Sequence, residues 1–223
     1  MNKRLDFPDV LRGFAIVLMV IYHFIYDMRV FDVILVNKDL PLFWVQFPKF
    51  IVLLFFVTVG MSLGINKKPG FYPPGFSKLC LKLFLGSLII TIVTYFAFPK
   101  KWVYFGTLHS ILAMKLVIAP MRKWKWIHLV LALGIIIPNT FFNVKFPFPH
   151  FDHQSMDYIP LLPWIAFGFL GIFLSKFSSL MNLRFSDLNV FNGLRWLGKR
   201  SFIIYLIHQP ILFGMAYLLT RFT

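Results

Sequence analysis

Long apolar segments recur along the sequence, each close to the roughly 20 residues that an α-helix needs to cross a bilayer. Charged residues lie almost entirely in the stretches between these segments. The candidate spans are residues 10–28, 48–65, 79–98, 103–120, 127–144, 158–175 and 201–220. We therefore expect an all-α integral membrane protein, a single bundle of about seven transmembrane helices that forms one domain over residues 1–223.

The composition points to lipid as the surrounding solvent. Of the 223 residues, 59% are hydrophobic, whereas soluble domains lie near 45–50%. A net charge of +15 would suit nucleic acid if it formed a basic face on a soluble fold. Here the basic residues form short clusters between apolar segments instead, so the expected partner is the lipid bilayer and nucleic acid is excluded. A homodimer is left open.

The distribution of lysine and arginine predicts an orientation. If the seven spans alternate in direction, fifteen of the 23 basic residues lie on the side of the amino terminus and seven on the opposite side. Cytoplasmic loops carry the excess of positive charge. We therefore predict a multi-pass protein of the cell inner membrane, with a cytoplasmic amino terminus and an external carboxyl terminus.

Several ionisable side chains lie inside predicted spans, where a charge near the middle costs roughly 2.5–3.5 kcal/mol on insertion scales. His23 and Asp27 in "VIYHFIYDMR" are four residues apart and share one helix face. His208 lies in "SFIIYLIHQP", beside Pro210. A neutral histidine accepts a proton near pH 7, and a nearby carboxylate orients its ring, so these three residues are the candidate catalytic groups. Alternatively, Asp27 reaches external water and His208 only joins helices.

Two further polar residues lie at predicted helix ends. His109 begins the fourth span and Asp157 begins the sixth. Each has two possible roles, a functional one and the capping of a helix. Tyr205 and His208 continue a polar stripe along the seventh span. The histidines show none of the spacings that are typical of a zinc site, so no metal is expected.

Basic residues at the cytoplasmic ends of the first and last spans indicate an anionic cofactor. Arg12 in "FPDVLRGFA" offers a guanidinium, which suits phosphate, and Gly13 allows a ligand or another backbone to approach. Lys199 and Arg200 in "WLGKRS" lie at the same depth. The alternatives are an ion pair of Arg12 with Asp9 and ordinary positive-inside topology.

Five motifs together resemble a known family. "FPDVLRGFAIVLMVIYHFIYD", "FFVTVGMSLGI", "FGTLHSIL", "DYIPLLPWIAFGFLGIFLS" and "LGKRSFIIYLIHQPIL" are similar, in this order, to the bacterial relatives of heparan-alpha-glucosaminide N-acetyltransferase. The resemblance covers nearly the whole chain. It implies a multi-spanning enzyme that takes an acetyl group from cytoplasmic acetyl-CoA. No histidine lies between Met28 and Phe50, where the animal enzymes carry an external one.

The residues and the resemblance together predict a membrane acyltransferase. It would move an acetyl or other acyl group from cytoplasmic acyl-CoA to an amine or hydroxyl of a small-molecule or glycan acceptor in the cell envelope. His23 with Asp27, or His208, would deprotonate the acceptor, and the acyl group would pass to it directly or through an acyl-histidine. The acceptor hydroxyls would be bound by His109 and Asp157, and Tyr205 is a further substrate-binding candidate. Gln209, or a backbone N–H freed near Pro210, would hold the oxyanion.

Two other classes of protein remain open at this stage. A proton-coupled transporter would use the same histidines and aspartates as a relay. A membrane scaffold would use them only to join helices. The enzymatic hypothesis requires the imidazoles of the first and last spans to meet.

Overall fold

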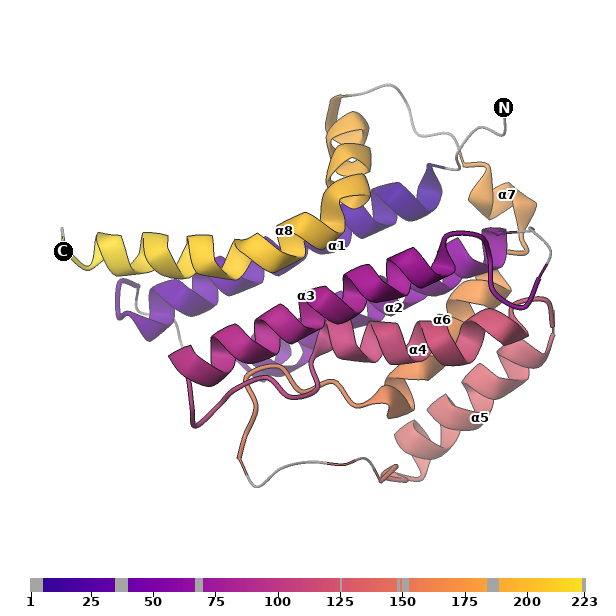
Figure 1. Cartoon of the computed structure of the whole chain (residues 1–223), viewed down its shortest axis with the longest axis horizontal. Helices are drawn as coiled ribbons and strands as arrows, with labels where there is room; N and C mark the ends of the chain where they lie inside the picture. Colours follow the sequence, from indigo (N-terminus) through magenta and orange to yellow (C-terminus); the bar gives the residue numbers. More distant parts are fainter. Residues whose placement is uncertain are drawn as a thin grey trace. The chain divides into compact units, whose positions relative to one another are not determined.

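The computed structural model describes residues 6–34, 40–66, 70–124, 126–147, 149, 153–183 and 189–221. Every regular element in these ranges is a helix (Figure 1). In chain order they are α1 (Phe7–Val30), η1 (Leu42–Gln46), α2 (Phe47–Ile65), α3 (Phe76–Ala97), α4 (Thr107–Met121), α5 (Ile127–Phe141), α6 (Leu161–Leu174), α7 (Ser178–Met181) and α8 (Asn189–Leu219). The prediction of an all-α protein is confirmed.

Each of the seven predicted spans coincides with an apolar helix, but the helices fall into two length classes. Four are long and apolar enough to cross a membrane, namely α1, the continuous stretch Leu42–Ile65, α3 and α8. The other three, α4, α5 and α6, have 14 or 15 residues. At 1.5 Å per residue such helices rise roughly 21–22 Å, less than the roughly 30 Å of a hydrocarbon core. The count of seven spans therefore stays a prediction.

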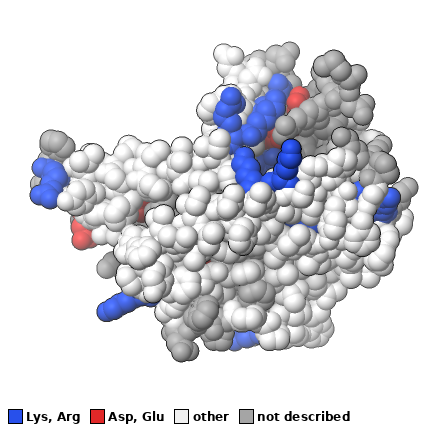
Figure 2. Space-filling view, viewed as in Figure 1, with Lys and Arg blue, Asp and Glu red and all other residues white. Residues whose placement is uncertain are grey.

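The outer surface is apolar over much of its extent, which fits a protein surrounded by lipid. Leu81, Ile89, Val93 and Phe96 of α3 are all more than half exposed. Contiguous apolar surface of this kind is rare on soluble monomers. Most of the face drawn in Figure 2 is likewise without charged side chains. The chain is a membrane protein.

The chain forms two compact units, and the boundaries between them fall within α2 and within α7. The first unit comprises Met1–Phe55 and Met181–Thr223, and the second comprises Phe56–Leu180. A single bundle over the whole chain stays a prediction.

In the first unit, α1 and α8 lie side by side (Figure 1). Glycines allow their backbones to come into contact at one end. A side chain at Gly13 would overlap the carbonyl of Leu194, and one at Gly198 would overlap the carbonyl of Asp9. Small residues permit this close packing between membrane helices. The glycine of the "DVLRG" motif thus admits the backbone of α8.

Further along, α1 and α8 run in the same direction. His23 contacts His208, Asp27 contacts Gln209, and Phe31 contacts Phe213, so the residue numbers rise together on both helices. Consecutive spans of one chain cross the membrane in alternating directions. If α1 and α8 are the first and last spans and run in the same direction, the total number of spans is therefore odd.

In the second unit, glycines again set the helix spacing. Gly60 of α2 meets the backbone of Gly168 in α6, and Gly171 meets the carbonyl of Val57. Phe56 and Met114 are completely or almost completely buried in this unit. The apolar core of the unit therefore forms where α2, α4 and α6 contribute small and large side chains.

A buried arginine fixes a loop of the second unit. Arg122, only 5% exposed, follows the end of α4. Its guanidinium donates to the carbonyls of Gly70 and Phe71 at 2.8 and 2.7 Å, and to that of Ala119 at 2.9 Å. Arg122 therefore connects the loop before α3 to the end of α4.

Replacing Gly198 with alanine tests the contact between α1 and α8. The added methyl would overlap the carbonyl of Asp9, so we expect a loss of about 1–3 kcal/mol in the free energy of unfolding. Gly193→Ala is the matched control on the same helix, because nothing lies within 4 Å of its Cβ position. Thermal unfolding in detergent measures both variants. Equal melting temperatures would contradict the close approach.

Candidate functional site

Two histidines from different helices meet in the first unit. The ring centroids of His23 on α1 and His208 on α8 are 4.9 Å apart, in a T-shaped arrangement at 61°. His23 is half-buried, whereas His208 is only 8% exposed. Tyr205, which was expected to share the polar stripe with His208, contacts the ring of His208 at 5.6 Å between centroids. The structure thus brings together the imidazoles that the enzymatic hypothesis requires to meet.

A hydrogen bond fixes the tautomer of His208. Its Nδ1 lies 2.7 Å from the carbonyl oxygen of Tyr205. A carbonyl only accepts, so Nδ1 carries the hydrogen and Nε2 of the neutral ring holds a lone pair. This Nε2 is buried and has no hydrogen-bond partner within the described ranges. His208 therefore presents an unoccupied proton acceptor.

The carboxylate of Asp27 faces α8. It is 2% exposed, and Nε2 of Gln209 donates to its two oxygens at 3.0 and 3.1 Å. Within the part of the chain that the structure describes, no hydrogen bond joins Asp27 to His23. We expected Asp27 to orient the ring of His23, but its carboxylate binds Gln209 instead.

The same contact changes the role that was expected of Gln209. An oxyanion needs a hydrogen-bond donor, and the amide nitrogen of Gln209 is turned toward Asp27. The amide oxygen, Oε1, is buried and has no partner among the described residues. Gln209 thus offers a second buried acceptor, one residue along α8 from His208.

His109 and Asp157 lie in the second unit, where both act on the start of α4. Asp157 accepts hydrogen bonds from the backbone N–H and the hydroxyl of Thr107, at 2.8 and 3.1 Å. Nδ1 of His109 accepts from the N–H of Gly106 at 3.2 Å, so its protonated Nε2 donates to the hydroxyl of Thr91, also at 3.2 Å. Asp157 was expected at the start of its own helix, but α6 begins only at Leu161. Both residues cap α4, and their binding of an acceptor stays a prediction.

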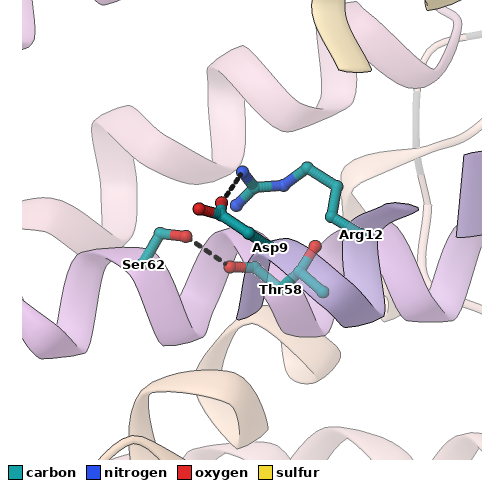
Figure 3. Close-up of polar contacts among 4 residues, drawn as sticks. All are labelled: Asp9, Arg12, Thr58 and Ser62. Carbon is teal, nitrogen blue, oxygen red and sulfur yellow. Dashed lines mark hydrogen bonds and ion pairs between the residues drawn. The ribbon is translucent and has the colours of Figure 1, made fainter. Parts of the chain in front are cut away.

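The three predicted cofactor-binding residues differ in their surroundings. Arg12 lies 3.5 Å from the buried carboxylate of Asp9, the local pair that the i,i+3 spacing allows (Figure 3). Lys199 and Arg200 are exposed on α8. The guanidinium of Arg200 lies 4.4 Å from the ring centroid of Trp196. In Figure 2, basic side chains gather over the first part of α8.

Hydroxyl groups also form hydrogen bonds within helices. Figure 3 shows Ser62 of α2, whose hydroxyl donates to the carbonyl of Thr58 at 2.8 Å. Serine commonly satisfies its hydroxyl in this way inside an apolar helix. In the described ranges, no group of three His, Cys or Asp side chains is arranged to hold a metal ion, and the absence of a metal from the function stays a prediction.

Some partners in these networks were not identified from the sequence. Thr91 binds His109, and His153 stacks on Trp102 with ring centroids 5.2 Å apart. The contact of Gln209 with Asp27 was also missed. The available signal was a single amide beside the histidine in "IHQP". It indicates a polar helix contact but does not identify the partner.

A comparison with known protein families shows the family to which the chain belongs. Residues 4–210 match the family described as Heparan-alpha-glucosaminide N-acetyltransferase, catalytic. The chain belongs to this family. No curated protein and no solved structure matches it.

The heparan-alpha-glucosaminide N-acetyltransferase family consists of membrane acetyltransferases that depend on acetyl-CoA. The match extends over α1 and along α8 as far as Pro210, so it includes both residues of the histidine pair. The resemblance seen in the five motifs is confirmed, and transferase activity is the general function of this membrane protein.

Substitution of Asp157 separates helix capping from acceptor binding. Asp157→Ala removes both acceptors of Thr107, so we expect the folded state to lose about 0.5–2 kcal/mol and the first amides of α4 to exchange faster. Asp157→Asn keeps one acceptor oxygen and should lose less. Hydrogen exchange at Thr107 and Ser110 measures the effect. Unchanged exchange in Asp157→Ala would contradict the capping role.

Proposed function

We propose that the chain is an acyl-CoA-dependent membrane acetyltransferase that acylates an amine of a cell-envelope sugar. The family match supports acetyl transfer in general. The observation that carries the finer proposal is the buried Nε2 of His208, which holds a lone pair and has no described partner. The donor, the acceptor and the choice of amine belong to the proposal.

His208 is the proposed general base. Its Nδ1–H bond to the Tyr205 carbonyl keeps Nε2 as the basic atom and stabilises the imidazolium that forms when Nε2 takes a proton. His23 lies against this ring and has no described hydrogen bond to a carboxylate. The base is therefore assigned to His208, with His23 as a neighbour of the reacting groups.

Two unpaired acceptors favour an amine over a hydroxyl. His208 Nε2 and Gln209 Oε1 both lack a described donor. The two side chains contact His23 and Asp27, which are one helical turn apart on α1. A neutral primary amine has two hydrogens and can satisfy both acceptors, whereas a hydroxyl has one. Leaving a buried acceptor unpaired costs about 1–3 kcal/mol.

The donor would bind with its phosphates on the basic part of α8. Lys199 and Arg200 are exposed there, and Arg12 lies on the adjoining part of α1. Lys199 precedes His208 by nine residues, roughly 14 Å along a helix. An acyl-CoA carries its phosphates at one end and its thioester at the other. Its phosphates would bind Lys199 and Arg200 while its thioester lies near His208.

The membrane topology belongs to the same proposal. We infer seven spans, an amino terminus in the cytoplasm of a bacterial cell and an external carboxyl terminus. The parallel course of α1 and α8 supports an odd number of spans. The basic residues of α8 would then face cytoplasmic acyl-CoA, in agreement with the positive-inside rule.

The proposed reaction is a direct displacement. The amine nitrogen attacks the thioester carbonyl carbon while its proton passes to Nε2 of His208. The carbon–sulfur bond then breaks, and the CoA thiolate takes the proton back from Nε2 as it leaves as free thiol. The products are an amide and CoA, and His208 ends in its original neutral form.

Acetyl transfer by the purified protein tests this function. We expect protein in lipid vesicles, given acetyl-CoA and glucosamine, to release CoA thiol and to form N-acetylglucosamine in equal amounts. His208→Gln should lower the rate by about 10²- to 10⁴-fold, the usual contribution of a general base. The melting temperature should change little.

His153→Gln is the matched control, because His153 packs on Trp102 in the other compact unit. It should retain the wild-type rate. Full activity in His208→Gln with a large loss in His23→Gln would move the base to His23. Facilitated flux of glucosamine without CoA release would support the proton-coupled transporter. Loss of folding alone in both variants would support the scaffold.

A further inference from the structure

The orientation of the Gln209 amide depends on Asp27. An ionised carboxylate accepts hydrogen bonds and donates none, so it binds the amide nitrogen and repels the amide oxygen. The nitrogen is found 3.0 and 3.1 Å from the two carboxylate oxygens. Asp27 is 2% exposed, so water does not compete strongly for these contacts. The carboxylate thereby selects one of the two amide orientations.

The selected orientation determines which atom of Gln209 remains for a ligand. Because the nitrogen faces Asp27, Oε1 is directed away from the carboxylate. This oxygen is buried and lacks a partner among the described residues. The reverse orientation would instead place an N–H donor at that position. The charge on α1 thus decides whether α8 presents an acceptor or a donor beside His208.

We propose that Asp27 is a positioning residue that acts through Gln209, and that the pair determines specificity for a nucleophile that donates hydrogen bonds. The inference rests on the proposed function for the identity of the ligand. Among the described residues no hydrogen bond joins Asp27 to His23, and in this scheme Asp27 does not touch the reacting atoms. Its effect passes through the amide, whose Oε1 accepts a hydrogen from the acceptor while His208 Nε2 accepts the other.

A purely structural role makes a different prediction. If the pair only joins α1 to α8, any substitution that keeps one hydrogen bond between the helices should leave acceptor binding unchanged. Asp27→Asn is such a substitution, because its amide pairs with Gln209 in either orientation. The orientation of Gln209 would no longer be fixed, although the helices stay connected.

Steady-state kinetics on Asp27→Asn test the inference, with glucosamine as the acceptor probe. We expect the KM for glucosamine to rise about 2- to 12-fold, which corresponds to one hydrogen bond. The KM for acetyl-CoA and the melting temperature should stay near the wild-type values. Asp32→Asn is the matched control, since Asp32 is exposed just beyond α1 and asparagine accepts its positive φ of 55°.

A double variant keeps the test decisive if Asp27→Asn folds poorly. In Asp27→Asn with Gln209→Glu, the new amide on α1 donates to a carboxylate on α8, which again presents acceptor oxygens. The KM for glucosamine should return toward the wild-type value. A role of Asp27 in orienting His23 predicts no such rescue, because the charge has left α1. An unchanged KM in Asp27→Asn, or no rescue, would overturn the inference.

Direct binding distinguishes this inference from the proposed function. If the wild-type protein binds glucosamine by calorimetry but transfers no acetyl group, the proposed function fails. The same 2- to 12-fold change in Kd for Asp27→Asn, with rescue in the double variant, would then still support the positioning role. Absence of both binding and transfer overturns both.

Discussion

The close contact between α1 and α8 is the constraint on which the candidate site depends. Membrane helices gain little from burying apolar surface against each other, because lipid is equally apolar, so packing and hydrogen bonds hold them together. Gly13 and Gly198 bring the two backbones together at one end. Further along, the same pair of helices brings His23 to His208 and Asp27 to Gln209. The site is a consequence of helix packing that begins several turns away.

Several buried polar groups in the described part of the chain are satisfied by a second helix or loop. Asp157 pairs with the start of α4, and the ring nitrogens of His109 each have a partner. Such completeness is the rule for buried polar atoms. His208 Nε2 and Gln209 Oε1 depart from it on adjacent residues of one helix, and Ser110 Oγ departs from it in α4. Local departures of this kind are expected at functional sites rather than in scaffolding.

Sequence reasoning identified the helices better than it identified the contacts between them. Segment length and hydropathy located seven apolar helices, because both are local properties of the chain. Spacing placed His23 and Asp27 on one face of a helix, but it carries no information about the helix that this face meets. Asp27 therefore appeared to serve His23, whereas its partner is Gln209, 182 residues away. Spacing also placed Asp157 at the start of its own helix, α6. Its side chain instead caps α4 through Thr107, which lies 50 residues earlier in the sequence.

The environment of His208 also bears on the choice between an enzyme and a proton-coupled transporter. A histidine in a relay takes a proton at one ring nitrogen and passes it on from the other. Here Nδ1 is held by the carbonyl of Tyr205 on its own helix, so a relay through the ring would have to break that bond. A general base has no such requirement, because it takes a proton at one atom and returns it from the same atom to the leaving group. The tethered ring is therefore better suited to group transfer than to proton conduction.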